Sequence, residues 1–308
     1  MRRPMLALGA AISLALASPT FAASSANQQS LAQPLQPSTQ ALLMTATRPV
    51  LFADLIPFDL ERHRRLTLPA QRTHFRFAAS ANLLPLNFAE VALAGAHYPI
   101  VFVAEGETVA LVAVAGLQPG RNQFVDAAGE WRADTYIPAY VRGYPFIALR
   151  PSPDAEPVLA LDPQATDFTR IDGVRLLTDD GQPGEQLKGI IAFQHEYRLL
   201  ADRTQLMTAA LRQAGVLEPG QLQVKGEGGD TRQIDGFLLV NEARLKALPA
   251  AALHTLMEAD ALGLAYAQIF SMRSLGNVFK VLAAVPSAPT LEKPTAKPRA
   301  RRAKKVAE

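Results

Sequence analysis

The chain has 308 residues, of which 49% are hydrophobic and 19% are charged, the balance of a globular protein with one large or two ordinary domains. It contains no cysteine, which excludes disulfide bonds, thiolate metal clusters, a catalytic thiol and a lipid-modified cysteine anchor. The mean hydropathy is near zero and the only uninterrupted apolar run is short, so a multi-span membrane protein is also excluded.

The formal net charge of +3 is unevenly distributed along the chain. Residues 286–308 carry seven basic and two acidic side chains, a surplus of five positive charges, so the other 285 residues sum to −2. The isoelectric point near 9.2 is therefore a property of the C-terminal tail. A folded basic face for nucleic acid is not indicated, and we do not expect nucleic acid as a partner.

The N-terminus has the order of a secretory signal peptide. Arg2 and Arg3 precede the 13-residue apolar segment Met5–Ala17, and small residues that follow predict cleavage after Ala22. We therefore expect residues 1–22 to be removed on export, with the protein reaching the periplasm or the cell surface. A mis-assigned start site would instead leave it in the cytoplasm.

The residues that follow the leader predict three further regions. Residues 23–49 are rich in Ser, Gln and Pro and have no core-forming periodicity, which predicts a disordered spacer. A folded body then runs over residues 50–285. The basic residues 286–308 offer almost nothing to a core and predict a disordered tail.

The first half of the body has the pattern of β-structure. The runs His97–Val103 and Thr108–Gly116 are rich in β-branched residues and predict a hairpin, and their apolar continuity indicates burial on both faces. Further short strands are predicted at Asn122–Val125, around Trp131 and at Val158–Asp162. Prolines between residues 138 and 157 predict extended or looped chain, since proline does not fit a helix interior or a central strand.

The second half has the period of α-helix. Apolar residues recur at steps of three and four from Ile190 to Ala214, and Gly215 stands at the position of a C-cap glycine. One long amphipathic helix is therefore predicted. The segments Leu222–Gly226 and Gln233–Val240 predict a second hairpin.

Helices are predicted again after that hairpin. Asn241 is a plausible N-cap, Pro249 suits the start of a helix, and a final apolar stripe runs from Leu262 to Leu282. The fold class is therefore α+β, with a β-rich N-terminal half with hairpins, followed by amphipathic helices flanking a further β-hairpin.

Five segments occur in a recognisable order: His74–Val103, Trp131–Leu149, LEPGQLQV, IDGFLLVNEARLKALP and ADALGLAYAQIFSMRSLGNVFKVLA. In this order and spacing they resemble the SapC family of bacterial proteins. The similarity runs from about Phe52 to Ala284. It implies a part in the bacterial surface layer or cell envelope, without a defined biochemical activity. The signal peptide and the basic tail depart from the family pattern, which puts cytoplasmic roles or the start site of this member in doubt.

A dense aromatic segment is the candidate ligand-binding region. Rigid aromatic faces bind sugar rings or prolines at little entropic cost. The opposing interpretation is that the same side chains fill the core between sheet and helices. The residues concerned are Trp131, Tyr136, Tyr140, Arg142 and Tyr144.

Catalytic and metal-binding patterns are weak. His195-Glu196 lacks the second histidine of a zinc peptidase, because Leu199 stands at that position, and no metal site is predicted. The glycine-rich residues 226–230 lack the lysine of a phosphate-binding loop, so no cofactor is predicted either. The fold could bring two carboxylates together as a catalytic pair, or the same acids could simply be solvated in loops, and both interpretations stay open. The candidates are Asp54, Asp59, Glu61 and Glu90.

The tail is a candidate polyanion-binding segment, through release of counterions. In an exported protein its partners would be anionic polymers or lipids of the envelope, and in the cytosol nucleic acids; a purely solubilising tail is the third alternative. The candidate residues are Lys297, Arg299, Arg301, Arg302, Lys304 and Lys305.

Two functions follow as hypotheses. The first is an exported binding or structural protein of the cell envelope or surface layer, whose partners are envelope components or a surface-layer protein. The second is an envelope hydrolase or peptide-modifying enzyme with a carboxylate and histidine site assembled by the fold. The second requires a closed pocket that holds titratable groups with shifted pKa values.

Overall fold

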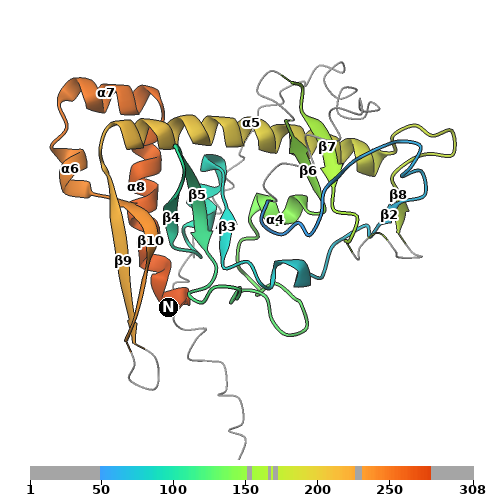
Figure 1. Cartoon of the computed structure of the whole chain (residues 1–308), viewed down its shortest axis with the longest axis horizontal. Helices are drawn as coiled ribbons and strands as arrows, with labels where there is room; N and C mark the ends of the chain where they lie inside the picture. The colour runs from blue at the N-terminus through green and yellow to red at the C-terminus, as the bar shows by residue number, and fades with distance from the viewer. Residues whose placement is uncertain (1–48, 151–154, 166–167, 169–172, 226–230, 279–308) are drawn as a thin grey trace, which may run out of the picture. The chain divides into compact units, whose positions relative to one another are not determined.

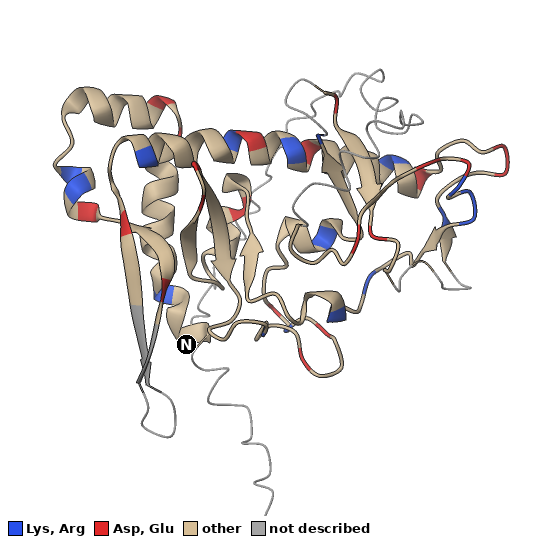
Figure 2. Ribbon diagram, viewed as in Figure 1, with Lys and Arg blue, Asp and Glu red and all other residues tan. Residues whose placement is uncertain are grey.

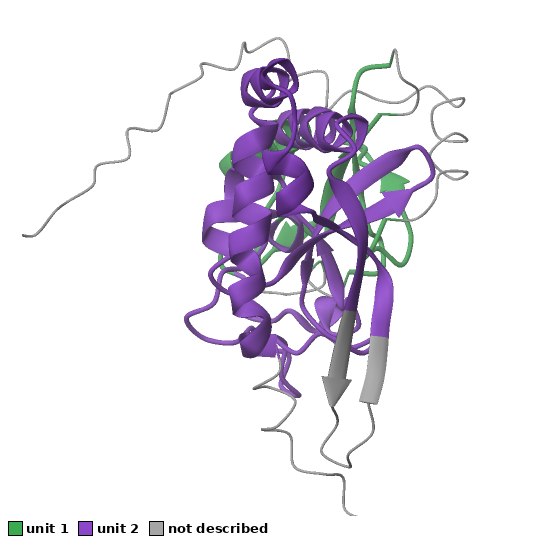
Figure 3. Ribbon diagram, turned by 90° about the vertical axis from the view of Figure 1, so that its left-hand side faces the viewer, with its two compact units in different colours: residues 1–71, 143–198 green, residues 72–142, 199–308 purple. Residues whose placement is uncertain are grey.

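The computed structural model describes residues 49–278, apart from residues 151–154, 166–167, 169–172 and 226–230. It confirms the α+β class, with a β-rich N-terminal half and the longer helices in the C-terminal part (Figure 1). The chain forms two compact units (Figure 3). Unit 1 contains residues 1–71 and 143–198, and unit 2 contains residues 72–142 and 199–308. Each unit is thus built from two separate segments of the chain. The sequence has no linker-like composition at the boundaries between them.

Unit 1 holds two small antiparallel sheets. The first has the order β1-β7-β6, with β1 at Ile56–Pro57, β7 at Val158–Leu161 and β6 at Phe146–Leu149. The second pairs β2 (Thr67–Leu68) with β8 (Val174–Arg175). The strand predicted at Val158–Asp162 is confirmed.

The long predicted helix is α5, which spans Glu185–Gln213 and contributes its first half to unit 1 and its second half to unit 2. The C-cap prediction is confirmed, since Gly215 has a φ of 67°, which favours glycine. In unit 1, Leu187 and Ile191 of α5 join an apolar core. The other buried members of this core are Phe58, Leu68, Phe146, Leu159, Leu161, Leu176 and Leu177.

A buried glutamine of α5 binds the free edge of the unit 1 sheet. Gln194 donates from Nε2 to the carbonyl of Phe146 (2.8 Å) and accepts from the backbone N–H of Ala148 at Oε1 (3.2 Å). Both partners belong to β6, one of the two edge strands of the sheet. An edge strand exposes unpaired backbone groups, and Gln194 satisfies two of them from the helix.

Unit 2 is organised around a five-stranded antiparallel sheet with the order β3-β5-β4-β10-β9 (Figure 1). The strands are β3 (Leu83–Pro85), β4 (Ile100–Glu105), β5 (Thr108–Val114), β9 (Leu217–Lys225) and β10 (Thr231–Val240). Both predicted hairpins are therefore confirmed, as β4–β5 and β9–β10.

Glycines shape the β9–β10 hairpin. A Cβ at Gly220 would lie 2.2 Å from the ring of Phe237, so only glycine lets this buried ring cross the neighbouring strand. The register shifts between Ile234 and Phe237, where Gly236 has a φ of 84°. The second half of the hairpin is thus a bulged strand rather than a regular one.

The strands predicted at Asn122–Val125 and around Trp131 are wrong. The structure has only the isolated bridge between Val125 and Trp131 there. The two residues flank a tight turn, in which Gly129 donates to the carbonyl of Asp126 (3.0 Å) and Glu130 donates to its side chain (2.9 Å). The preceding backbone groups bond to other segments, since the N–H groups of Asn122 and Gln123 donate to the carbonyls of Ala79 and Ala115 (both 2.8 Å), so the pairing does not extend beyond the bridge.

The helices of unit 2 beyond α5 are short. Asn241 is confirmed as an N-cap, because its side chain accepts from the N–H of Arg244 (2.8 Å). The final predicted stripe begins in α8, and its residues from Phe279 on lie outside the described part. The elements are η1 (Arg76–Ala78), η2 (Phe88–Glu90), α3 (Val91–Ala94), α4 (Ala139–Gly143), α6 (Glu242–Lys246), α7 (Ala250–Glu258), α8 (Ala261–Ser271) and η4 (Met272–Ser274).

Helix α8 packs on the sheet of unit 2 and is bonded to two of its strands. Gln268 accepts from the N–H of Val240 in β10 (3.0 Å) and donates to the carbonyl of Ile100 in β4 (3.1 Å). Ser271 accepts from the N–H of Ile100 (3.0 Å). Polar side chains on an otherwise apolar helix thus join the backbones of β4 and β10.

Candidate functional site

A buried carboxylate, Glu90, is the centre of the candidate site in unit 2. Its side chain lies at the end of η2, and the residue is only 5% exposed. Oε1 accepts from the N–H of Asn87 (2.9 Å), which is one half of a capping box and fixes the start of this short helix. The sequence produces this locally, since Asn at the N-cap and Glu three residues later satisfy free N–H groups.

The second oxygen of Glu90 reaches a different segment. Oε2 accepts from the N–H of Ala139 (2.7 Å), the first residue of α4, and from the hydroxyl of Tyr136 (3.0 Å). Burial raises the pKa of Glu90, against the opposing effect of these donors and of Arg142. The carboxylate therefore holds η2 and the start of α4 together, and both of its oxygens are engaged.

Tyr136 and Arg142 extend this arrangement to the surface. Arg142 is exposed and donates to the Tyr136 hydroxyl (3.3 Å) and to the carbonyl of Ile137 (3.2 Å). Its guanidinium lies 5.8 Å from the centre of the Tyr136 ring. Burial, followed by the charge of Glu90, raises the pKa of Tyr136 to about 12. The result is a chain of hydrogen bonds, Arg142 to Tyr136 to Glu90, with its cationic end in solvent.

Tyr98 fixes the backbone of Tyr136, the middle residue of this series of hydrogen bonds. It is fully buried, donates to the carbonyl of Tyr136 (2.5 Å), and packs against Phe124 with ring centroids 4.4 Å apart. Burial raises its pKa. A neutral buried donor therefore fixes the residue whose side chain links Arg142 to Glu90.

The other aromatic candidates serve in packing. Trp131 is buried against Phe75, with ring centroids 5.5 Å apart, and Tyr140 is buried, which raises its pKa. Tyr144 belongs to unit 1, where its hydroxyl donates to buried Asp162 (3.2 Å). Of the five predicted residues, the structure brings together only Tyr136 and Arg142 as a partly exposed pair.

The remaining carboxylate candidates have local roles. Asp59 accepts from the N–H of Arg62 (2.7 Å) and Asp54 from that of Leu55 (2.8 Å), while Glu61 is exposed. These three belong to unit 1, whereas Glu90 belongs to unit 2. Their described bonds stabilise turns of the backbone.

The histidines form no described metal site. Among the described residues, no group of three or more histidine, aspartate or glutamate side chains is placed to hold a metal ion. His63 is buried, and its Nδ1 accepts from the N–H of Asp59 (2.9 Å). Burial lowers its pKa, so the neutral ring is favoured in the folded loop.

A cavity of about 390 Å³ lies elsewhere in unit 2. Its charged lining residues, Glu107 and Arg212, face each other with 3.5 Å between their nearest side-chain atoms. Neither Glu90 nor Tyr136 lines it. The groups with raised pKa values and this cavity therefore do not coincide. The other lining residues are Thr108, Val109, Gln205, Ala209 and Gln213.

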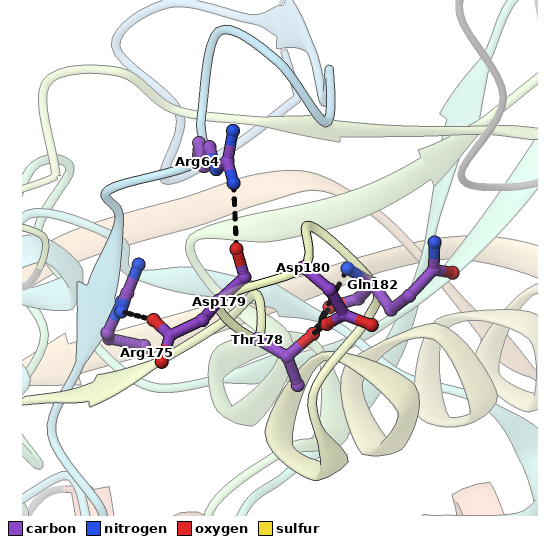
Figure 4. A network of polar contacts seen from close by, with 6 residues as sticks. All are labelled: Arg64, Arg175, Thr178, Asp179, Asp180 and Gln182. Carbon is purple, nitrogen blue, oxygen red and sulfur yellow. Dashed lines mark hydrogen bonds and ion pairs between the residues drawn. The ribbon is translucent and has the colours of Figure 1, made fainter.

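A surface network of polar contacts in unit 1 surrounds the turn before α5 (Figure 4). Arg64 donates to the carbonyl of Asp179 (2.8 Å), Arg175 pairs with the Asp179 carboxylate, and Thr178 bonds to Asp180 and to Gln182. The Arg175 and Asp179 side chains are well exposed, and such pairs contribute about 0–1 kcal/mol. This network closes the turn before α5 and offers no enclosed site.

Sequence analysis identified the residues that organise the site only in part. Glu90 was only one of four acids, and Tyr98 was not singled out. The Asn87 to Glu90 spacing is the available signal, since it is a capping-box pattern. The tail candidates Lys297, Arg299, Arg301, Arg302, Lys304 and Lys305 lie outside the described residues.

Comparison with known proteins identifies a family and no named relative. Within the described residues, no helix has the length and apolar character needed to span a membrane. Neither the curated proteins nor the solved structures include a match to this chain. Residues 58–278 match the SapC family, in agreement with the order of segments noted above. Since this match spans most of the chain, the protein belongs to the SapC family.

Proposed function

We propose that this protein is exported and acts in the cell envelope as a binding protein whose contact face is formed by Tyr136 and Arg142. One observation carries the proposal: the exposed Arg142 guanidinium is held on the Tyr136 ring by hydrogen bonds that end at buried Glu90. Such an arrangement presents a fixed cation and an aromatic edge to solvent. Its natural ligand is an anionic envelope polymer, such as an acidic polysaccharide.

The same geometry favours binding over hydrolysis. Glu90 is the acid with a raised pKa in this cluster, but its two oxygens already accept three hydrogen bonds. A general acid must instead place its proton within reach of a substrate. The exposed end of the cluster, Arg142, lies in solvent, which suits recognition of a ligand at the surface.

Export predicts a specific mature N-terminus. The basic residues, the apolar segment and the small residues up to Ala22 are those that signal peptidase recognises. Protein recovered from the periplasm or envelope should therefore begin at Ala23 by N-terminal sequencing. Recovery only of the intact chain, beginning at Met1 and confined to the cytosol, would contradict this prediction.

Ligand binding predicts a selective loss on removal of Arg142. We expect Arg142→Ala to weaken co-sedimentation of the purified protein with isolated envelopes at least about tenfold, since one charge-assisted contact contributes about 1.5–3 kcal/mol. Arg132→Ala is the matched control, because Arg132 is also an exposed arginine over an aromatic ring in unit 2, with its guanidinium 5.9 Å from Phe124.

The control separates the site from general charge. Equal losses in the two arginine variants would show that only overall positive charge matters and would refute the proposed face. Steady release of soluble fragments from the envelopes by the wild-type protein would refute the non-enzymatic role.

A further inference from the structure

Helix α8 is apolar on more faces than the one that packs on the sheet. No Lys, Arg, Asp or Glu occurs in Ala261–Ser271, and the helix is uncharged along its length (Figure 2). The flanking charges are Asp260 and Arg273. Its inner face, with Leu264 and Gln268, is buried. A helix that is apolar all round is usually covered all round. The outer face of α8 is therefore unusual, because it is apolar and yet exposed to solvent.

The outer face exposes a large aromatic side chain. Phe270 is 58% exposed, Tyr266 lies one turn before it with ring centroids 6.1 Å apart, and the Arg273 guanidinium lies 5.8 Å from the Phe270 ring. Half-buried Leu262 and Ile269 border the aromatic pair. More than half of the Phe270 surface therefore stays in water, and contact with a partner would bury this apolar area.

The same face lacks a side chain at one position, Gly263, and we call this gap the notch. Gly263 is exposed, and a Cβ built on it would have no atom within 4 Å. Gly263 precedes Phe270 by seven residues, so the two lie on one side of the helix about 10 Å apart. A projecting ring and an open position thus occur on one surface, at opposite ends of it.

The charges at the two ends of α8 are opposite. Glu258 and Asp260, both with exposed side chains, stand at the N-terminal end, and Arg273 stands just beyond the C-terminal end. Within the chain, Asp260 pairs with Arg203, and Glu258 lies 3.4 Å from Nδ1 of His254, so a partner's arginine would add to these contacts. Two such helices in antiparallel contact would bring unlike charges together at both ends. Their helix dipoles would also oppose each other favourably.

We propose that the outer face of α8 is a homodimer interface, in which two copies of this chain pair antiparallel about a two-fold axis near Tyr266. The midpoint between Gly263 and Phe270 then coincides with that between Asp260 and Arg273. Phe270 therefore enters the notch over Gly263 of the partner subunit, and Arg273 faces Asp260 of the partner subunit. A two-fold interface needs such a self-complementary surface, whereas a flat lipid surface needs neither notch nor charge pairing.

The association is tested by measuring mass in solution. Light scattering on the purified protein over a range of concentrations should show a dimer. Phe270→Glu should weaken association at least about 100-fold, because the lost contact occurs twice in the interface. Leu206→Glu is the matched control, since Leu206 is 72% exposed on α5 and should leave the dimer intact.

The absence of cysteine gives a direct test of geometry. In the double variant Gly263→Cys, Phe270→Cys, the two positions of one copy are too far apart for a disulfide, which needs Cα atoms within about 7 Å. Oxidation should therefore yield covalent dimers, and each single variant should yield far fewer. Preserved fluorescence of the single Trp131 shows that the variants fold.

Three results would overturn the proposal. The first is a wild-type monomer at every concentration, and the second is an equal loss of association in the Phe270 and Leu206 variants. The third is a monomer that binds vesicles of anionic lipid in a manner that depends on Phe270, which would assign the face to a membrane surface.

Discussion

Replacing Gln268 by methionine is expected to destabilise unit 2 by about 3 kcal/mol, because two buried backbone groups lose their partners at about 1–3 kcal/mol each. The carbonyl of Ile100 and the N–H of Val240 both bond to this side chain. They belong to neighbouring strands whose register pairs Leu238 with Phe102. Methionine has a similar length and fills the space, so the loss reports on the hydrogen bonds rather than on a cavity.

Urea unfolding followed by tryptophan fluorescence provides the measurement. The single tryptophan, Trp131, is buried in unit 2, so its emission follows the unfolding of that unit. Gln205→Met on the exposed side of α5 is the control, and such surface changes usually stay within about 0.5 kcal/mol. A loss below about 1 kcal/mol for Gln268→Met would show that the strands hold together without it.

Removal of the Glu90 side chain should have an effect of similar size. Glu90→Ala leaves the N–H groups of Asn87 and Ala139 and the hydroxyl of Tyr136 without their acceptor. We expect a loss of about 3–4 kcal/mol in the free energy of unfolding. Glu130→Ala is the control, because Glu130 is an exposed glutamate in the same unit. Equal effects of the two substitutions would contradict the anchoring role of Glu90.

The raised pKa of Glu90 predicts how its contribution depends on pH. Because burial raises this pKa in the folded state, the native protein binds the proton more strongly than the unfolded chain. The contribution is then fully present below about pH 4.5 and declines as pH rises through the folded pKa. The difference in stability between wild type and Glu90→Gln should shrink over that window. A difference that grows with pH would mean that the hydrogen bonds outweigh burial.

Periodicity predicted most of the secondary structure in the described part. The β4–β5 hairpin, the β9–β10 hairpin, α5 and the Asn241 cap all follow from local patterns. The strands predicted at Asn122–Val125 and around Trp131 failed because the N–H groups of Asn122 and Gln123 bond to distant residues, Ala79 and Ala115, and local turn chemistry does not reveal such partners. The two units were missed because their boundaries fall within continuous sequence, one of them inside α5.

The candidate site was predictable only in part. Aromatic density pointed to Tyr136 and Arg142, but it could not separate them from buried Trp131, Tyr140 and Tyr144. Burial depends on contacts between segments far apart in the sequence, such as that between Glu90 and Ala139. The glutamines Gln194 and Gln268 are polar residues at buried positions of helices, and only this mismatch with the apolar pattern indicates a special role. Their partners are backbone groups, which no side-chain pattern reveals.

The interleaving of the two units limits how this protein is assembled and exchanged. The chain passes from one unit to the other after residues 71, 142 and 198, so any single cut leaves at least one unit without part of its sheet or helix. Neither unit is encoded by one continuous stretch of sequence, so a single recombination event would not transfer either of them whole. During synthesis, β1 cannot pair until β7 has been made, about a hundred residues later. Pairing between segments so far apart in the sequence slows folding. Both units therefore depend on the same continuous chain, and unit 1 can be completed only after the first segment of unit 2 has been synthesised.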